Sequence, residues 1–114
     1  MEETFGRSLR ALRRARGITQ RELARTVGVD FSYVSKLEND RMPPPAAETV
    51  VRICEALDVD PDELLAATGK MPPRIEQSIG SSVAAIRFLR SAQRMELSDA
   101  EWARLSEYLD LLRE

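Results

Sequence analysis

The segment from Thr19 to Asn39 restricts the possible folds more than any other part of this chain of 114 residues. It opens with Thr19-Gln20-Arg21-Glu22, a capping box in which the threonine hydroxyl and the glutamate carboxylate each accept a hydrogen bond from a backbone N–H at the start of a helix. Gly28 favours the left-handed backbone that ends a helix, and Asp30 can cap the next one. Apolar residues at helical spacing lie on both sides of this turn: Leu23, Ala24, Val27, Val34 and Leu37. The segment predicts two short helices joined by a glycine-containing turn.

Three more helices are predicted around this unit. The first contains Phe5, Leu9 and Leu12 and ends at Gly17. Pro43-Pro44-Pro45 must be extended, because proline pushes the residue before it out of the helical region. A helix from about residue 46, whose start lacks a side-chain cap, then carries the inward residues Val50, Ile53, Cys54 and Leu57.

The last of the three helices has the strongest start signal. Asp60-Pro61-Asp62-Glu63 combines a cap, a proline at the first helical position and acids that favour the helix dipole. Leu64 and Leu65 point inward, and Gly69 ends the helix. No segment in this region alternates as a strand does, so the fold class is all-α, with five short helices.

Lys70-Met71-Pro72-Pro73 interrupts the helical pattern, and we place a domain boundary there, between residues 1–70 and 71–114. Beyond it lies an apolar stripe at Ile75, Ile79, Val83, Ile86 and Leu89, either continuous or broken at residues 80–82. A second capping box, Ser98-Asp99-Ala100-Glu101, opens a last helix. Its apolar seam is Trp102, Leu105, Leu109 and Leu112. Residues 71–114 are therefore predicted to form a helical hairpin.

The sequence does not indicate an enzyme or a metal site, and its Asp and Glu residues are not arranged in a recognisable catalytic pattern. The sequence has no histidine, the commonest general base and transition-metal ligand. Its one cysteine, Cys54, cannot form an internal disulfide or a structural zinc site, and its inward position suits an inert core residue. We expect no catalytic residue, no metal and no cofactor.

Location in the cytoplasm is the expectation from three features. A lone cysteine fits a reducing compartment. No apolar stretch approaches the ~20 residues of a membrane span. Met1-Glu2-Glu3-Thr4 is acidic and lacks the apolar segment of a secretory signal.

Charge is unevenly distributed, although the net charge is only −2. From Arg7 to Arg41 there are nine basic and four acidic residues, whereas from Met42 to Lys70 two basic residues face six acids. A basic part beside an acidic flank is suited to presenting one face to phosphate. A solvated charged surface has the same pattern, so charge alone leaves both interpretations open.

Three runs at fixed offsets point to a family: residues 17–24 (GITQRELA), 27–29 (VGV) and 33–39 (YVSKLEN). Together with residues 48–50, 56–59 and 62–65 they strongly resemble the Cro/CI-type helix-turn-helix family, also called the XRE family. The resemblance implies a five-helix lambda-repressor-like domain over residues 5–70 that binds double-stranded DNA. It also implies a cytoplasmic, nucleoid-associated transcriptional repressor of bacterial or phage type.

The resemblance carries roles to individual positions. Gln20 matches a phosphate-contacting glutamine at the start of a helix, where an anion is also favoured. Arg13 and Glu38 match an internal ion pair. The implied DNA-binding residues are Gln20 and Arg21, then Phe31, Ser32, Tyr33, Ser35 and Lys36 facing the groove, and Asn39 and Arg41 on the backbone. Lys36 can donate to guanine, and Phe31 or Tyr33 can contact a thymine methyl. Familiar operators are not transferred, because the groove-facing positions lack glutamine.

For residues 71–114 we favour dimerisation over folding back onto the domain, because Pro72-Pro73 separates the apolar stripe from it. A dimer suits a palindromic operator whose half-sites are about 34 Å apart. The expected homodimer residues are Ile86, Leu89, Trp102, Leu105, Leu109 and Leu112. The alternative is a partner-controlled regulator or antitoxin, in which these helices bind a toxin, an antirepressor or a protease.

Overall fold

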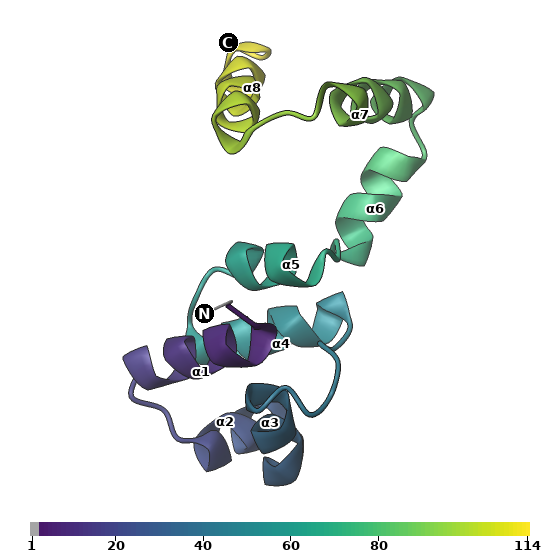
Figure 1. Ribbon diagram of the computed structural model, residues 1–114. Coiled ribbons are helices and arrows are strands. Elements are labelled where there is room, and N and C mark those ends of the chain that lie inside the picture. The colour runs from purple at the N-terminus through teal and green to yellow at the C-terminus, as the bar shows by residue number, and fades with distance from the viewer. Residues whose placement is uncertain (1–2) are drawn as a thin grey trace. The chain divides into compact units, whose positions relative to one another are not determined.

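The structure is a computed structural model that describes residues 3–114, so Met1 and Glu2 of the acidic N-terminal run lie outside the described residues. All regular secondary structure in the described range is helical, which confirms the all-α prediction. The helices are α1 (Phe5–Ala15), α2 (Gln20–Val27), α3 (Phe31–Glu38), α4 (Ala47–Leu57), α5 (Asp62–Thr68), α6 (Pro73–Gly80), α7 (Val83–Met95) and α8 (Asp99–Leu111) (Figure 1). The chain divides into two compact units, one reaching to Ile75 and the other spanning Glu76–Glu114.

Most predicted helix ends are confirmed. Thr19 and Glu22 form the capping box at α2, with Glu22 N–H donating to the Thr19 hydroxyl at 3.1 Å and Thr19 N–H donating to the Glu22 carboxylate at 3.3 Å. Ser98 and Glu101 form the second capping box at α8. Gly28 ends α2 with a φ of 85°, a left-handed conformation that side chains with a Cβ disfavour. These helix ends could be predicted from the sequence because each depends on residues within one helical turn.

Two predicted caps were wrong in detail. Asp30 precedes α3 as the N-cap residue, but its side chain makes no capping hydrogen bond. At α5 the N-cap position belongs to Pro61, and Asp60 instead accepts a hydrogen bond from the backbone N–H of Asp62 at 2.8 Å. In the second unit the apolar stripe is interrupted, because α6 ends at Gly80 and Ser82 caps α7 by accepting a hydrogen bond from Ala85 N–H.

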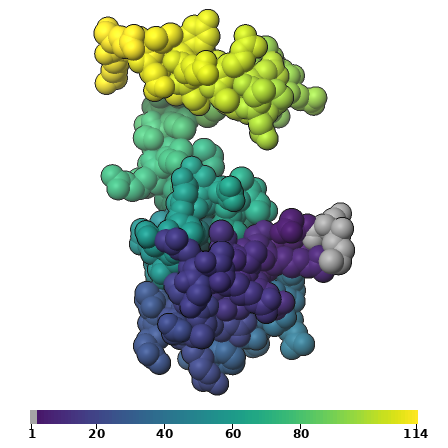
Figure 2. Space-filling model, turned by 90° about the vertical axis from the view of Figure 1, so that its left-hand side faces the viewer, coloured from purple at the N-terminus to yellow at the C-terminus, as the bar shows by residue number. Residues whose placement is uncertain are grey.

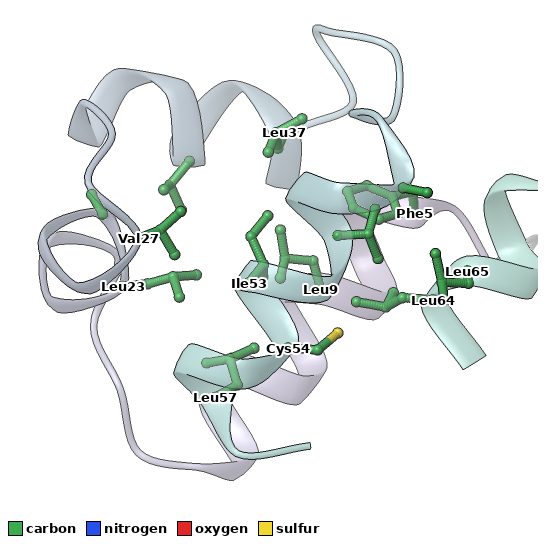
Figure 3. Close-up of a cluster of buried hydrophobic side chains, with 14 residues drawn as sticks. Phe5, Leu9, Leu23, Val27, Leu37, Ile53, Cys54, Leu57, Leu64 and Leu65 are labelled. Carbon is green, nitrogen blue, oxygen red and sulfur yellow. The ribbon is translucent and has the colours of Figure 1, made fainter. Parts of the chain in front are cut away.

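The first unit has one hydrophobic core that holds α1 to α5 together (Figure 3). Leu9, Val50 and Cys54 are fully buried at its centre, and Leu64 and Leu65 contribute from α5. Figure 3 shows Leu23, Ile53 and Leu9 converging from three different helices. The prediction that Cys54 is a core residue is confirmed, and burial raises the pKa of its thiol to about 11.

The start of α1 is attached closely to the end of α3. A Cβ atom on Gly6 would lie 2.5 Å from the carbonyl oxygen of Leu37, so the two backbones approach as only glycine allows. Asp40, at a φ of 55°, accepts hydrogen bonds from Gly6 N–H at 2.9 Å and from the Thr4 hydroxyl at 2.6 Å. These bonds fix where α3 ends relative to α1.

The second unit has almost no core of its own. Ala92 is the one buried residue among residues 76–114, all of which are described. An open cavity of about 300 Å³ lies within the unit, lined by apolar side chains of α7 and α8 that include Phe88 and Tyr108. In the space-filling view these helices, in lime green to yellow, form one continuous surface (Figure 2). Large apolar side chains therefore remain accessible there.

Candidate nucleic-acid interface

Helix α3 has one face in the core and one face in solvent. Val34, Leu37 and Glu38 are buried, whereas Ser32 and Lys36 are exposed one turn apart. Phe31, the first residue of the helix, is 40% exposed. The two remaining positions expected to face a groove, Tyr33 and Ser35, are only partly exposed, and Tyr33 packs against the core. The accessible face of α3 therefore consists mainly of Phe31, Ser32 and Lys36.

A buried carboxylate, Glu38, connects α3 with α1 and α2. Arg13 donates to it twice, from Nε to Oε2 at 2.6 Å and from Nη2 to Oε1 at 2.9 Å. Gln20 Nε2 donates to Oε1 at 2.9 Å, and Arg10 Nε lies 3.4 Å from the same oxygen. The Arg13–Glu38 ion pair is thus present as expected. The two side chains are 10% and 0% exposed, so the pair is screened from water.

Protonation of this pair is shifted by its surroundings. Burial by itself raises the pKa of Glu38, but the hydrogen bonds from Arg13 and Gln20 outweigh it, and the net pKa lies below its ordinary value of 4.5. The hydrogen bond to Glu38 also raises the pKa of Arg13. Both groups are therefore charged at neutral pH, and α3 is held in place by a fixed ionic contact.

Two side chains expected to contact the DNA backbone also have partners within the protein. Gln20 gives one amide N–H to Glu38, which leaves its second N–H available, since an amide nitrogen carries two. Asn39 donates from Nδ2 to the carbonyl of Ser35 at 2.8 Å and accepts from Arg10 Nη2 at 2.8 Å. The network orients both amides at the surface.

The arginines of the first unit fall into two groups. Arg10 and Arg13 bind Glu38, Arg16 donates to the carbonyls of Leu57 and Asp58, and Arg52 donates to the carbonyl of Val27. The second group has no carboxylate or carbonyl partner among the described residues. It includes Arg14, Arg21, Arg25 and Arg41, and the same holds for Lys36. Their charge is available to an external anion.

A hollow lined by arginines lies beside α3. Its lining includes Arg10, Arg13 and Arg14 from α1, Gln20 and Arg21 from the start of α2, and Phe31 from the start of α3. Among the described residues that form this lining there is no acid. The guanidinium carbon of Arg21 lies 4.5 Å from the centroid of the Phe31 ring, a cation–π contact. The hollow is suited to a negatively charged ligand.

Sequence reasoning missed three of these features. It left Arg10 without a role, it assigned nothing to Asp40, and it did not anticipate the Arg21–Phe31 contact. The spacing of Arg10 and Arg13 places both on one helix face, a weak signal that they share a partner. The other two contacts link residues ten or more positions apart, and no local pattern marks them.

The residues expected to mediate dimerisation lie in the second unit and are accessible in this chain. Ile86 and Leu89 on α7 are 39% and 37% exposed. Trp102 and Leu109 on α8 are 40% and 65% exposed, and Leu112 follows the helix at 74%. Leu105 is half-buried. Their apolar surface is available for contact with another chain.

The part of the chain that the structure describes was also compared with the requirements of a metal site and of a membrane span. Residues 3–114 contain no group of three or more histidine, cysteine, aspartate or glutamate side chains placed to hold a metal ion. None of the helices in that range is long and apolar enough to cross a membrane.

Comparison with known proteins identifies what the first unit is similar to. Residues 4–67 match a family model described as a helix-turn-helix domain. The transcriptional regulator RghRB of Bacillus subtilis (strain 168) is 38% identical over 65 residues, which are 57% of this chain and 47% of that protein. The transcriptional repressor RghR of the same organism is 36% identical over 67 residues, 59% of this chain and 50% of that protein. This chain therefore spans about half the length of the curated relatives it matches.

A solved structure gives the same result for the fold. The P22 c2 repressor in complex with a synthetic operator superposes with a TM-score of 0.51 and 30% identity. The match covers 58% of this chain and 98% of that one.

Proposed function

The chain belongs to the helix-turn-helix family of transcriptional regulators, of the Cro/CI type, and on this basis we propose that it is a sequence-specific repressor that inserts α3 into the major groove of double-stranded DNA. The family is one of DNA-binding regulators, not of enzymes. One observation carries the proposal for this chain. The accessible face of α3 presents Ser32 and Lys36, while its opposite face is held in the core by Val34, Leu37 and Glu38.

The proposed DNA contacts divide by chemistry. Lys36 and Ser32 read base edges, because an ammonium donates to guanine O6 and N7 and a hydroxyl serves as donor or acceptor. Gln20, Asn39 and Arg41 contact the phosphate backbone and set the position of the protein on the duplex. Tyr33 and Ser35, being partly exposed, contribute at the margin of the groove.

Residues 71–114 are proposed to associate with another chain. The support is the exposed apolar surface of α7 and α8, since soluble monomers rarely leave large contiguous apolar patches in water. A homodimer places two α3 helices in successive major grooves about 34 Å apart, as a palindromic operator requires. The alternative occupant is a toxin, an antirepressor or a protease, which would make this a partner-controlled regulator. Either form acts at the nucleoid, in the bacterial cytoplasm.

Selection of bound sequences from random duplex DNA tests the DNA-binding proposal. We expect enrichment of a two-fold symmetric site and binding that weakens steeply with salt. Lys36→Ala should relax the preference at one base position in each half-site, whereas Asn39→Ala should weaken binding to all sequences. Absence of enrichment at every salt concentration would refute sequence-specific binding.

Analytical ultracentrifugation of the full chain tests the association. Trp102→Ala should shift the protein from dimer to monomer at micromolar concentration. The matched control is Arg52→Ala on α4, since Arg52 lies in the first unit and donates to the carbonyl of Val27. A monomeric wild-type protein would exclude the homodimer and leave association with a different protein as the remaining function for α7 and α8.

A further inference from the structure

We propose that Arg21 binds a backbone phosphate in the arginine-lined hollow, and that Phe31 is the residue that positions Arg21 and does not read a base. This inference rests on the proposed function and deepens it, because it gives the first residue of α3 a role different from that of Ser32 and Lys36. It also gives a role to Arg21, which the family resemblance placed in the DNA interface without assigning it a specific contact.

The guanidinium of Arg21 lies over the ring of Phe31. Arg21 is the second residue of α2 and Phe31 is the first residue of α3, so the contact spans the turn between the two helices. The guanidinium carbon lies 4.5 Å from the ring centroid. A guanidinium carries five N–H donors, so one that lies over a ring keeps donors for other acceptors.

Arg21 has no anionic partner among the residues that the structure describes. No ion pair is formed by Arg21 within residues 3–114. Arg10 and Arg13 line the same hollow, but both are paired with the carboxylate of Glu38. An arginine held in one orientation with unused donors matches a phosphate, which guanidinium groups bind through two parallel hydrogen bonds.

The surroundings of Arg21 are positively charged. The lining brings Arg14 and Arg21 together with Gln20 at the N-terminus of α2, and no acid is among the described residues there. The positive end of the α2 dipole adds to the charge of these side chains. The local field therefore favours an anion, whereas a base edge has both donors and acceptors.

The contacts of the Phe31 ring favour a role in positioning Arg21 over a role in reading a base. The ring is 40% exposed, and the guanidinium of Arg21 already covers one of its faces. Packing on a thymine methyl would use apolar ring surface that Arg21 partly occupies. A ring that supports Arg21 instead gains from the attraction between cation and π face in every complex, whatever the base sequence.

Binding titrations of the full chain against two duplexes test this, one carrying the selected site and one unrelated, each over a range of salt concentrations. Arg21→Gln should weaken binding to both duplexes and reduce the slope of log affinity against log salt by about 0.9, as loss of one phosphate contact does. Phe31→Leu should weaken binding to both duplexes by about two- to five-fold, and Phe31→Tyr should bind as the wild type does.

Double variants supply the decisive comparison. In an Arg21→Gln background, Phe31→Leu should have no further effect, because the residue that it positions is gone. In an Arg25→Gln background it should keep its full effect, since Arg25 is an exposed arginine of the same helix outside the lining of the hollow. Phe31→Met replaces Phe31→Leu if circular dichroism shows that the leucine variant is unfolded.

Two results would overturn the inference while leaving the proposed function intact. One is an equal loss on Phe31→Leu with and without Arg21. The other is a repeated selection with Phe31→Leu that changes the preferred base at one position, which would make Phe31 a base-reading residue. A wild-type protein that binds neither duplex would overturn the inference and the proposed function together.

Discussion

Replacement of Glu38 by alanine tests how the first unit is held together. Glu38 is 2% exposed, and the substitution removes its carboxylate, which accepts hydrogen bonds from Arg13, Gln20 and Arg10. Arg13 would keep only the carbonyl of Ile18, at 2.9 Å, as an acceptor. Its guanidinium would then be a buried charge without a counter-ion.

The magnitude follows from that unpaired charge. Removing one partner of a buried ion pair costs about 3–5 kcal/mol of unfolding free energy. A folded unit of this length has a stability of about 4–10 kcal/mol, so the loss is about 30% of the total or more. Exposed pairs behave differently. The Asp58 side chain that pairs with Arg16 is 95% exposed, so removing its charge should cost less than about 1 kcal/mol. Asp58→Asn tests this, because the backbone at position 58 has a φ of 55°, which asparagine tolerates better than alanine.

Urea unfolding of the full chain, followed by far-UV circular dichroism, measures these free energies as differences between variants, because the helices of the second unit are the same in all of them. Fluorescence of Trp102 is unsuitable for this purpose, because that residue belongs to the second unit. The double variant Arg13→Met/Glu38→Leu should recover most of the stability that Glu38→Ala loses, since it leaves no buried charge unpaired. Arg10, which also loses Glu38, is 33% exposed and keeps its hydrogen bond to Asn39. A Glu38→Ala protein that loses no more than Asp58→Asn would refute the reasoning, as would a double variant as unstable as the single one.

Three further predictions follow from the same structure. The pKa of Glu38 lies below 4.5 in the folded protein. The stability that Glu38 contributes is therefore complete above the pKa of the unfolded state and is lost as the pH falls through the pKa of the folded state. The urea midpoint should fall more steeply below pH 4.5 for the wild type than for Glu38→Ala. Gly6→Ala places a methyl group against the backbone of α3 and should destabilise the first unit by about 1–3 kcal/mol in the same assay, with Gly80→Ala, where a Cβ meets nothing within 4 Å, as the control. Cys54, with a pKa of about 11, should react with a disulfide reagent at pH 8 only when urea unfolds the protein, and prompt reaction of the native chain would show that its thiol is accessible.

The sequence was informative wherever a structural signal lies within one or two helical turns. The capping boxes at Thr19 and Ser98 and the left-handed glycines at 28 and 69 involve groups that are always near each other, so local chemistry determines them. The buried face of α3 was predictable for the same reason, because helical spacing alone selects Val34 and Leu37. The resemblance to a known family added the Arg13–Glu38 pair, which no local pattern indicates.

Tertiary structure decided which of several similar residues bind one another. Helix α1 offers arginines at 7, 10, 13 and 14, and their order in the chain does not say which one reaches the carboxylate of Glu38. Packing of α1 against α3 brings Arg13 and Arg10 to it. The turn between α2 and α3 likewise brings Arg21 over Phe31. Side-chain partners far apart in sequence depend on how whole helices pack, and that depends on the sum of many contacts in the core.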